Sequence, residues 1–345
     1  MKILFQCDYN EGAHPRILDR LVQTNMEQTP GYGEDIYCQR AAELICKKCQ
    51  DDTLAVHFMV GGTQTNATVI DAALRSHQGV ICADTGHINV HETGAVEAMG
   101  HKVLALPCRD GKLTAEQVEK TCLAHGDNEH MVQPKMVYIS NPTELGTIYT
   151  RAELEELSAV CRKYDLILFL DGARLGYGLA AADNELDLPL IASCCDVFYI
   201  GGTKAGALFG EAVVIRNEAL KRDFRYYMKQ KGGLLAKGRL LGIQFITLFE
   251  DGLYEELSEH AIRMADELRA VLEELNYPFL VKNGTNQLFP ILPDEELNRL
   301  AEDFEFNYEQ KTDETHHAVR FCTSWATREE NVEKLKEALR GLKQK

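Results

Sequence analysis

The chain has 345 residues, of which 45% are hydrophobic, and a formal net charge of −16. This is the composition of a globular protein with room for a large core and two domains, and it excludes a disordered chain. The acidic balance disfavours nucleic acid and anionic membrane surfaces as partners, because like charges repel. No apolar run reaches the roughly 18 residues of a membrane-spanning helix, and the apolar run at residues 3–5 is too short for a signal-peptide core.

The 11 cysteines are odd in number and scattered through apolar segments. This pattern favours reduced, buried thiols and a cytoplasmic protein over a disulfide framework. Cys46 and Cys49 form a C-x-x-C pair inside a predicted amphipathic helix, and no second pair stands at the spacing of a zinc ribbon. We therefore predict no metal site.

In chain order, short apolar runs alternate with amphipathic helical patterns. Strands are predicted at residues 53–60, 80–83, 102–106, 136–139, 166–170, 196–200 and 208–215. Helices are predicted at 67–74, at 114–122 and after a capping residue, Thr150, whereas 84–92 is predicted as a loop. Strands that alternate with helices form βαβ units. The predicted fold class is α/β, with a mostly parallel central sheet flanked by helices and a smaller α+β C-terminal domain.

Beyond residue 215 the pattern changes. Residues 229–239 are basic and rich in glycine, which indicates a solvated loop or a phosphate contact. A long amphipathic helix is predicted at 253–275, followed by strands near 287–289 and 318–322, a helix at 294–300 and a last helix capped by Thr327. We predict a large domain, residues 1–250 with an N-terminal arm, and a small one, residues 251–345.

Polar residues follow several of the predicted strands directly. Gly62 and Thr63 lie in a glycine-rich turn before a helix, where backbone N–H groups and the positive helix end can hold a single phosphate. His87, Asp171 and Lys204 each follow another strand. Ligands of parallel sheets bind at the carboxyl ends of the strands, so we expect these residues to converge.

Each feature also has a purely structural interpretation. The glycine turn could be an ordinary turn, Lys204 could solvate its loop, and Asp171 could pair with Arg174. Arg320 could be an edge-strand arginine with its charge in solvent. Taken together, however, these residues are suited to pyridoxal phosphate, which needs an amine to hold its aldehyde, an acid at its ring nitrogen and an anchor for its phosphate.

Several motifs match a known family. They are Gly12-Ala13-His14-Pro15, Gly62-Thr63 with Asn66, His87 with Glu92 and Gly94-Ala95, Glu144-Leu145-Gly146-Thr147, Asp171-Gly172-Ala173-Arg174 and Gly202-Thr203-Lys204. On these motifs the chain resembles the low-specificity threonine aldolases, in the β-eliminating lyase group of fold-type I pyridoxal-phosphate enzymes. The resemblance covers residues 7–244 and returns more weakly around Arg320.

For the cofactor, the resemblance implies that Lys204 forms the Schiff base and that Asp171 pairs with the pyridine nitrogen. His87 would stack on the ring, and Gly62 with Thr63 would hold the phosphate. Pyridoxal 5′-phosphate is thus the expected cofactor.

For the substrate, the resemblance implies that Arg320 binds the α-carboxylate and that Arg174 reaches the same carboxylate or the phenolate side of the cofactor. His130 would lie near the β-hydroxyl group. Cys7 stands where the family usually has serine or asparagine, a position that helps to hold the carboxylate, and a thiol is a weaker donor.

The implied reaction is retro-aldol cleavage of threonine or allo-threonine to glycine and acetaldehyde. His87, His130 or a bound water could take the β-hydroxyl proton. Two alternatives stay open: β-elimination from an amino acid to pyruvate and ammonia, and a non-catalytic pyridoxal-phosphate-binding protein. The resemblance also implies a homodimer or homotetramer with shared active sites, to which residues 229–239 could contribute a phosphate contact.

Overall fold

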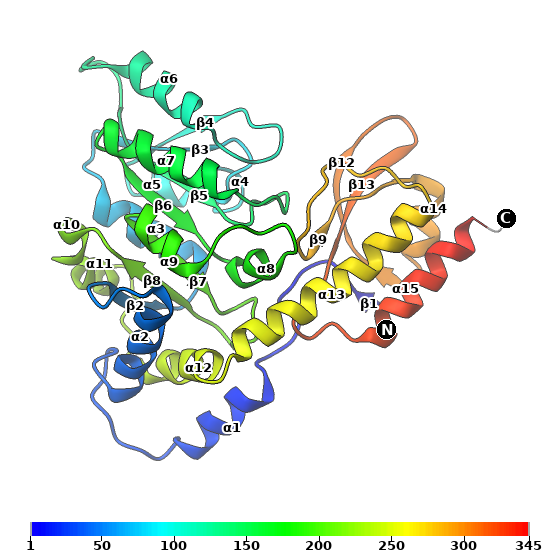
Figure 1. Cartoon of the computed structure of the whole chain (residues 1–345), viewed down its shortest axis with the longest axis horizontal. Helices are drawn as coiled ribbons and strands as arrows, with labels where there is room; N and C mark the ends of the chain where they lie inside the picture. Colours follow the sequence, from blue (N-terminus) through cyan, green and yellow to red (C-terminus); the bar gives the residue numbers. More distant parts are fainter. Residues whose placement is uncertain (1, 344–345) are drawn as a thin grey trace.

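A computed structural model describes residues 2–343, and a seven-stranded sheet forms its centre (Figure 1). Its strands are β2 (Ala55–Met59), β3 (Gln78–Ala83), β4 (Lys102–Leu106), β5 (Gln133–Ser140), β6 (Ile167–Asp171), β7 (Val197–Gly201) and β8 (Glu211–Ile215). Their order across the sheet is β2-β8-β7-β6-β5-β3-β4. Only β8 runs against the other strands. The predicted, mostly parallel sheet is confirmed.

Helices cover both faces of this sheet. They are α1 (Pro15–Gln23), α2 (Ile36–Cys49), α3 (Gly62–Ala73), α4 (His87–Val90), α5 (Ala95–Ala98), α6 (Ala115–His125), α7 (Arg151–Lys163), α8 (Leu175–Ala180), α9 (Leu188–Cys194), α10 (Glu218–Lys221), α11 (Phe224–Gln230) and α12 (Arg239–Phe249). Along β7, Phe198 and Ile200 pack with α2, α7, α9 and α12, whereas Val197 and Tyr199 pack with α3 and α11. Successive side chains of a strand point to opposite faces, so a strand covered on both sides is apolar throughout.

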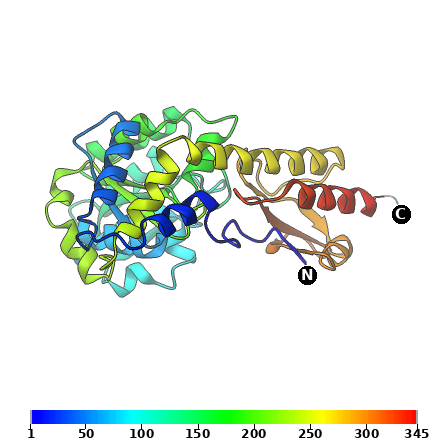
Figure 2. The same ribbon diagram turned by 90° about the horizontal axis from the view of Figure 1, so that it is seen from below.

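The remaining elements form a second, smaller layer beside the sheet (Figure 1). They are β1 (Ile3–Leu4), α13 (Leu253–Glu274), β9 (Gln287–Leu288), β10 (Ile291–Pro293), α14 (Asp294–Leu300), β11 (Phe304–Glu305), β12 (Asn307–Lys311), β13 (His316–Cys322) and α15 (Glu329–Leu342). Helices α13 and α15 lie side by side over the strands (Figure 2). The predicted α+β character of this part is confirmed.

The N-terminal arm packs against this smaller part. Strand β1 pairs in parallel with β11, and Phe5 belongs to the apolar cluster formed by α13, α14 and α15. Helix α13 contributes Leu253 and Leu257 to the core of the large sheet and Leu268 and Leu272 to that of the small part. The division into residues 1–250 and 251–345 stays a proposal.

Some local predictions were wrong. Residues 84–92 are not all loop, because α4 forms a single turn there. The last sheet strand begins at Glu211 rather than at 208, because the side chain of Gln244 accepts the N–H group of Leu208. Helix α15 has Arg328 at its N-cap instead of Thr327, whose hydroxyl accepts the N–H group of Ser324.

All 11 cysteines are free thiols, and Cys46 and Cys49 are buried on α2. Within residues 2–343, no group of three or more His, Cys, Asp or Glu side chains is arranged to hold a metal ion. In the same range, no helix combines the length and the apolar character that crossing a membrane requires.

Candidate active site

Two adjoining cavities lie at the carboxyl ends of the parallel strands. The first has a volume of about 320 Å³ and the second a volume of about 550 Å³. Both are lined by Tyr9, His87, Glu144, Arg174 and Lys204. The first cavity also contains Gly61, Gly62, Thr63, Asp171 and Glu211, and the second also contains His91, Glu309 and Arg320. Most of the residues predicted from the sequence therefore meet at one edge of the sheet.

Lys204 follows β7 in a turn that is pressed against the loop after β6. The N–H group of Gly201 donates to the carbonyl oxygen of Gly172 at 2.9 Å. A Cβ atom on Gly201 would lie 2.3 Å from the carbonyl oxygen of Ala173, so no larger residue fits at this position. This close approach of the two loops brings Asp171 and Lys204 to the same cavity.

The Lys204 amine is poised to lose its proton. Burial lowers its pKa, and the nearby Arg174 guanidinium lowers it further. Burial has the opposite effect on the carboxyl group of Glu211, whose pKa it raises to about 8. Glu211 accepts hydrogen bonds from the Thr203 hydroxyl at 2.8 Å and from the Gly202 N–H group at 3.2 Å, so it also holds the turn that presents Lys204. A deprotonated amine is the form that attacks an aldehyde.

Asp171 faces the cavity from the end of β6. Its carboxylate accepts hydrogen bonds from the Tyr138 hydroxyl at 2.5 Å, the Asn66 amide at 3.1 Å and the Ala173 N–H group at 3.0 Å. Burial alone would raise its pKa, but the hydrogen bonds from Tyr138 and Tyr199 hold the pKa of Asp171 below its usual value. The carboxylate is therefore ionised without a cationic side chain bound to it.

A buried network orients His87. Its Nδ1 atom lies 2.8 Å from Glu92 Oε1, and that oxygen accepts the Asn66 amide at 2.8 Å. The backbone N–H group of His87 donates to the carboxylate of Glu144 at 2.9 Å. Burial lowers the pKa of His87, but the hydrogen bond to Glu92 and the charge of Asp171 raise it above its usual value. Asn66 and Glu92 stood in the family motifs without a role, and both act here by holding the two groups that face the cavity.

Arg174 is not the partner of Asp171, which the structural interpretation of this motif had suggested. Its Nε and Nη2 atoms donate to the carboxylate of Asp8 at 2.6 and 3.0 Å. Asp8 has no exposed side-chain surface and also accepts the Asn286 amide at 3.0 Å. Asp8 could not be assigned to the site from the sequence, because the two residues of this ion pair lie far apart in the chain.

Arg320 reaches the second cavity from β13. Its Nη2 atom donates to the carbonyl oxygen of Gln6 at 3.2 Å, and its Nη1 atom to the side chain of Gln287 at 3.4 Å. A carboxylate oxygen of Glu309 lies 3.4 Å from its Nε atom. Among the described residues, 2–343, no carboxylate forms a close, bidentate pair with this guanidinium, in contrast to Arg174.

The glycine turn opens helix α3. Gly61 is the N-cap of this 12-residue helix and provides no side-chain hydrogen bond to the helix end. Gly61, Gly62 and Thr63 line the first cavity together with Thr203. Uncapped N–H groups at a helix N-terminus form a binding site for an anion such as phosphate.

Two predicted site residues lie elsewhere. Cys7 is beside the site, but its thiol donates to the Asn10 side chain at 3.1 Å and lines a separate pocket. His130 is exposed in the loop before β5, at the opposite end of the strands from the cavities. Within residues 2–343 of one chain, His130 therefore lines neither cavity, and its place near the β-hydroxyl group stays a prediction. His91 was not assigned to the site from the sequence, and the structure shows that it lines the second cavity.

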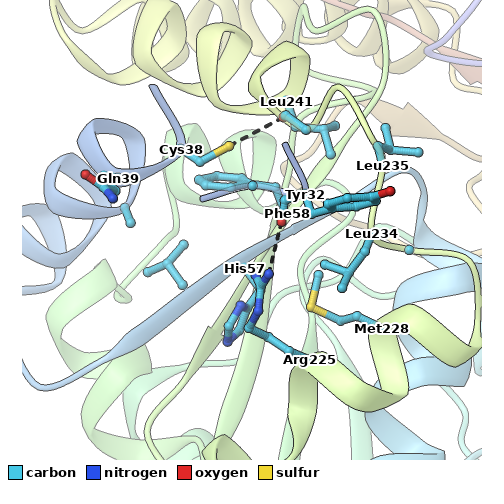
Figure 3. Close-up of a pocket in the computed structure, with 15 residues that line it drawn as sticks. Tyr32, Cys38, Gln39, His57, Phe58, Arg225, Met228, Leu234, Leu235 and Leu241 are labelled. Carbon is cyan, nitrogen blue, oxygen red and sulfur yellow. Dashed lines mark hydrogen bonds between the residues drawn. The ribbon is translucent and has the colours of Figure 1, made fainter. Parts of the chain in front are cut away.

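A third pocket, of about 190 Å³, lies apart from these residues between α2, β2 and the segment after α11 (Figure 3). It is mostly apolar, and Figure 3 shows His57 and Phe58 of β2 among its lining residues, together with Leu234 and Leu235. It contains none of the predicted site residues. The basic segment 229–239 forms one wall of this pocket, and its Lys231 pairs with Asp71 at 2.8 Å, so the segment does not reach the first cavity of its own chain.

The residues of the two cavities fit pyridoxal phosphate. The uncapped end of α3 would hold the phosphate, Lys204 the aldehyde and the ionised Asp171 the ring nitrogen. His87 lines the same cavity and would lie against the ring. These residues thus provide one group each for the phosphate, the aldehyde, the ring nitrogen and the ring face of this cofactor.

Some known proteins are similar to this chain in sequence, and solved structures share its fold. The Pseudomonas low specificity L-threonine aldolase is 30% identical over 98% of this chain and 97% of its own length. A solved structure of the Leishmania major threonine aldolase is 47% identical, with a TM-score of 0.97 over 99% of both chains. Aspartate aminotransferase from Thermus thermophilus shares the fold at 16% identity, with a TM-score of 0.72 over 98% of this chain and 91% of its own.

The fold-type I architecture expected from the resemblance is thereby confirmed. The sequence profile described as "Beta-eliminating lyase" matches residues 10–294, which includes the loops that carry His87, Asp171 and Lys204. With a match over most of its length, the chain belongs to the beta-eliminating lyase family.

Proposed function

We propose that the chain cleaves β-hydroxy-α-amino acids such as threonine or allo-threonine into glycine and an aldehyde, with pyridoxal phosphate as its cofactor. The observation that carries this proposal is the position of Lys204, which lines one cavity with Asp171 and an adjoining cavity with Arg320. The Pseudomonas and Leishmania relatives, both named as threonine aldolases, support the substrate class.

Each group of the chain has a distinct task in this proposal. When bound, pyridoxal phosphate supplies an electron sink for the bond that breaks at Cα. Lys204 would hold the cofactor, because its lowered pKa favours the neutral amine that attacks an aldehyde, and the same amine, once protonated, would return that proton to Cα. The ionised carboxylate of Asp171 would keep the ring nitrogen protonated. Arg320 binds the α-carboxylate and so fixes which Cα bond is broken.

A base must also take the β-hydroxyl proton, and we propose His91 for this step. Its ring lies 5.4 Å from that of His87 and lines the second cavity. Burial and the neighbouring His87 lower the pKa of His91, so its imidazole is neutral and can accept a proton at neutral pH. A bound water and His87 remain alternatives, whereas His130 could reach such a site only in another subunit.

A product assay tests this function. Purified protein with pyridoxal phosphate is offered L-threonine, L-allo-threonine and L-serine, and acetaldehyde, glycine, pyruvate and ammonia are measured. We expect acetaldehyde and glycine in equal amounts from the two threonine isomers. Pyruvate and ammonia as main products would favour β-elimination. A bound cofactor with no product from any substrate would favour a non-catalytic binding protein.

We also propose that the chain works in the cytoplasm on a small amino acid, as a homodimer or homotetramer with shared active sites. The net charge of −16 and the 11 free thiols support this setting. Residues 229–239 could then contact a phosphate in a neighbouring subunit. The mass of the protein in solution, measured by light scattering, tests the assembly, and a monomer with full activity would contradict it.

A further inference from the structure

A β-bulge directs one acidic side chain into the second cavity. Strands β12 and β13 pair Asn307 with Arg320 and Tyr308 with Val319, and the register then shifts, so that Glu309 has no partner residue. An extra residue of this kind bends its strand and re-aims a side chain, which is why bulges are frequent beside active sites. Glu309 lines the second cavity together with Arg320 and His91.

The bulge places Glu309 beside the arginine that the substrate needs. Glu309 Oε1 lies 3.4 Å from Arg320 Nε, and this buried Nε atom forms no hydrogen bond of good geometry with any residue in the described part of the chain. The exposed fractions of the two side chains are 18% for Arg320 and 32% for Glu309. A loose, partly exposed pair of this kind contributes little to stability, so a substrate carboxylate can replace it with bidentate hydrogen bonds.

The other arginine of the site provides a contrast. Arg174 is clamped by the buried Asp8 at 2.6 and 3.0 Å. Arg320 is therefore the cation whose carboxylate partner can be exchanged, and Glu309 is the carboxylate that stands in the place of the substrate. Its charge remains in the cavity after displacement, where a second carboxylate on the substrate would meet it.

We propose that Glu309 is a specificity-determining residue, which competes with the substrate α-carboxylate for Arg320 and disfavours substrates that carry a second carboxylate. This proposal rests on the proposed function. In this proposal the negative charge of Glu309 raises the KM for neutral amino acids, and the same charge selects against 3-hydroxyaspartate.

The test compares Glu309→Gln with Glu305→Gln. Glu305, on the neighbouring β11, pairs with Lys2 at 3.4 Å and does not line either cavity. The variant Glu305→Gln therefore removes one negative charge outside the site and is a matched control. For Glu309→Gln we expect the KM for L-threonine to fall about three- to tenfold, with kcat within about twofold. Its preference for threonine over 3-hydroxyaspartate should fall about tenfold, because the repulsion is lost. Glu305→Gln should behave as the unaltered protein.

A binding measurement separates this proposal from the reaction itself. Glycine is titrated into the cofactor-loaded proteins, and its Kd is read from the change in cofactor absorbance. We expect the Kd to fall in Glu309→Gln by the same factor as the KM. If the unaltered protein binds glycine but cleaves no substrate, the proposed function fails, and the glycine titration still decides the role of Glu309.

Unchanged Kd and KM values, or equal changes in Glu305→Gln, would overturn the proposal. A variant Glu309→Ala provides a second test if the glutamine variant does not fold. It removes the same charge and should change Kd, KM and selectivity in the same direction.

Discussion

Arg174 and Asp8 form a bidentate ion pair whose carboxylate is completely buried, with donor–acceptor distances of 2.6 and 3.0 Å. The pair joins the loop after β6 to the N-terminal arm, which itself packs on the smaller part of the chain. The wall shared by the two cavities therefore depends on a contact between distant parts of the sequence.

Replacing Asp8 by asparagine should destabilise the protein strongly. The change leaves the buried Arg174 charge without a partner, for which we expect a loss of about 3 to 5 kcal/mol in the free energy of unfolding. Unfolding in urea measures it. The control Glu34→Gln breaks the exposed pair between Arg225 and Glu34 and should cost less than about 1 kcal/mol. Equal losses in the two variants would contradict a special role for the buried pair.

The effect of Asp8→Asn should also depend on pH. Burial opposes ionisation of Asp8, but the charge of Arg174 holds its pKa below the usual value. A lowered pKa stabilises the folded state above the unfolded pKa of about 3.9, and this contribution is lost as the pH falls. The difference in stability between the two proteins should therefore shrink below about pH 4. A constant difference down to pH 2 would contradict this.

Replacing Lys204 by alanine should remove both the covalently held cofactor and the activity. Within residues 2–343 no other lysine lines either cavity, so we expect the visible absorbance of the purified protein to disappear and kcat to fall by at least about a thousandfold. Absorbance spectra and the aldehyde assay measure the two effects. Lys120→Ala, a change of a lysine that is 71% exposed and pairs with Glu116 on α6, is the control and should keep both. A coloured Lys204→Ala protein would exclude Lys204 as the attachment point.

Replacing Asp171 by asparagine should separate cofactor binding from turnover. Lys204 and the end of α3 are unchanged, so the cofactor should still bind, whereas kcat should fall by a factor of about 100 or more because the ring nitrogen loses its ionised partner. The control Asp165→Asn changes an exposed residue before the other end of β6. Normal turnover in Asp171→Asn would remove this residue from the mechanism.

Replacing Glu211 by glutamine should change how stability varies with pH. The pKa of Glu211 is raised to about 8 by burial, from an unfolded value of about 4.3. Between these two pKa values the folded protein holds a proton on Glu211 that the unfolded protein has lost. The free energy of unfolding therefore falls as the pH rises from about 4 to about 8. Glu211→Gln should therefore gain stability relative to the unaltered protein over this range.

Thermal or urea unfolding of the cofactor-free proteins, measured from pH 4 to pH 9, checks this expectation. Glu218→Gln is the control, because Glu218 is 82% exposed and pairs with Lys221 on the surface. Parallel pH curves for Glu211→Gln and the unaltered protein would show that Glu211 is already ionised at neutral pH.

Local patterns in the sequence predicted the main elements and the edge of the sheet where the site lies. The strand at 102–106 and the helix at 294–300 have the predicted bounds. The spacing of apolar residues and the residues that begin or end an element depend on only a few neighbouring positions. The convergence of Gly62, His87 and Asp171 was also predictable, since parallel strands end at one edge.

Other features depend on contacts that no local pattern contains. Glu309 has the charge of an ordinary surface residue, and only the shifted register of β12 against β13 turns it towards Arg320. His130 stands in a polar segment like other candidates, and only its position before β5 places it away from the cavities of its own chain.

The βαβ order, the glycine turns and the strand ends that carry reactive side chains can be read from the residues alone, because they follow from short-range sterics and from the burial of apolar runs. Which charges meet depends on how distant segments pack against one another. Asp8 binds Arg174 and leaves Asp171 free for a ligand because the N-terminal arm folds back onto the sheet, and the energy of a buried ion pair depends on distances between segments that the order of residues does not specify.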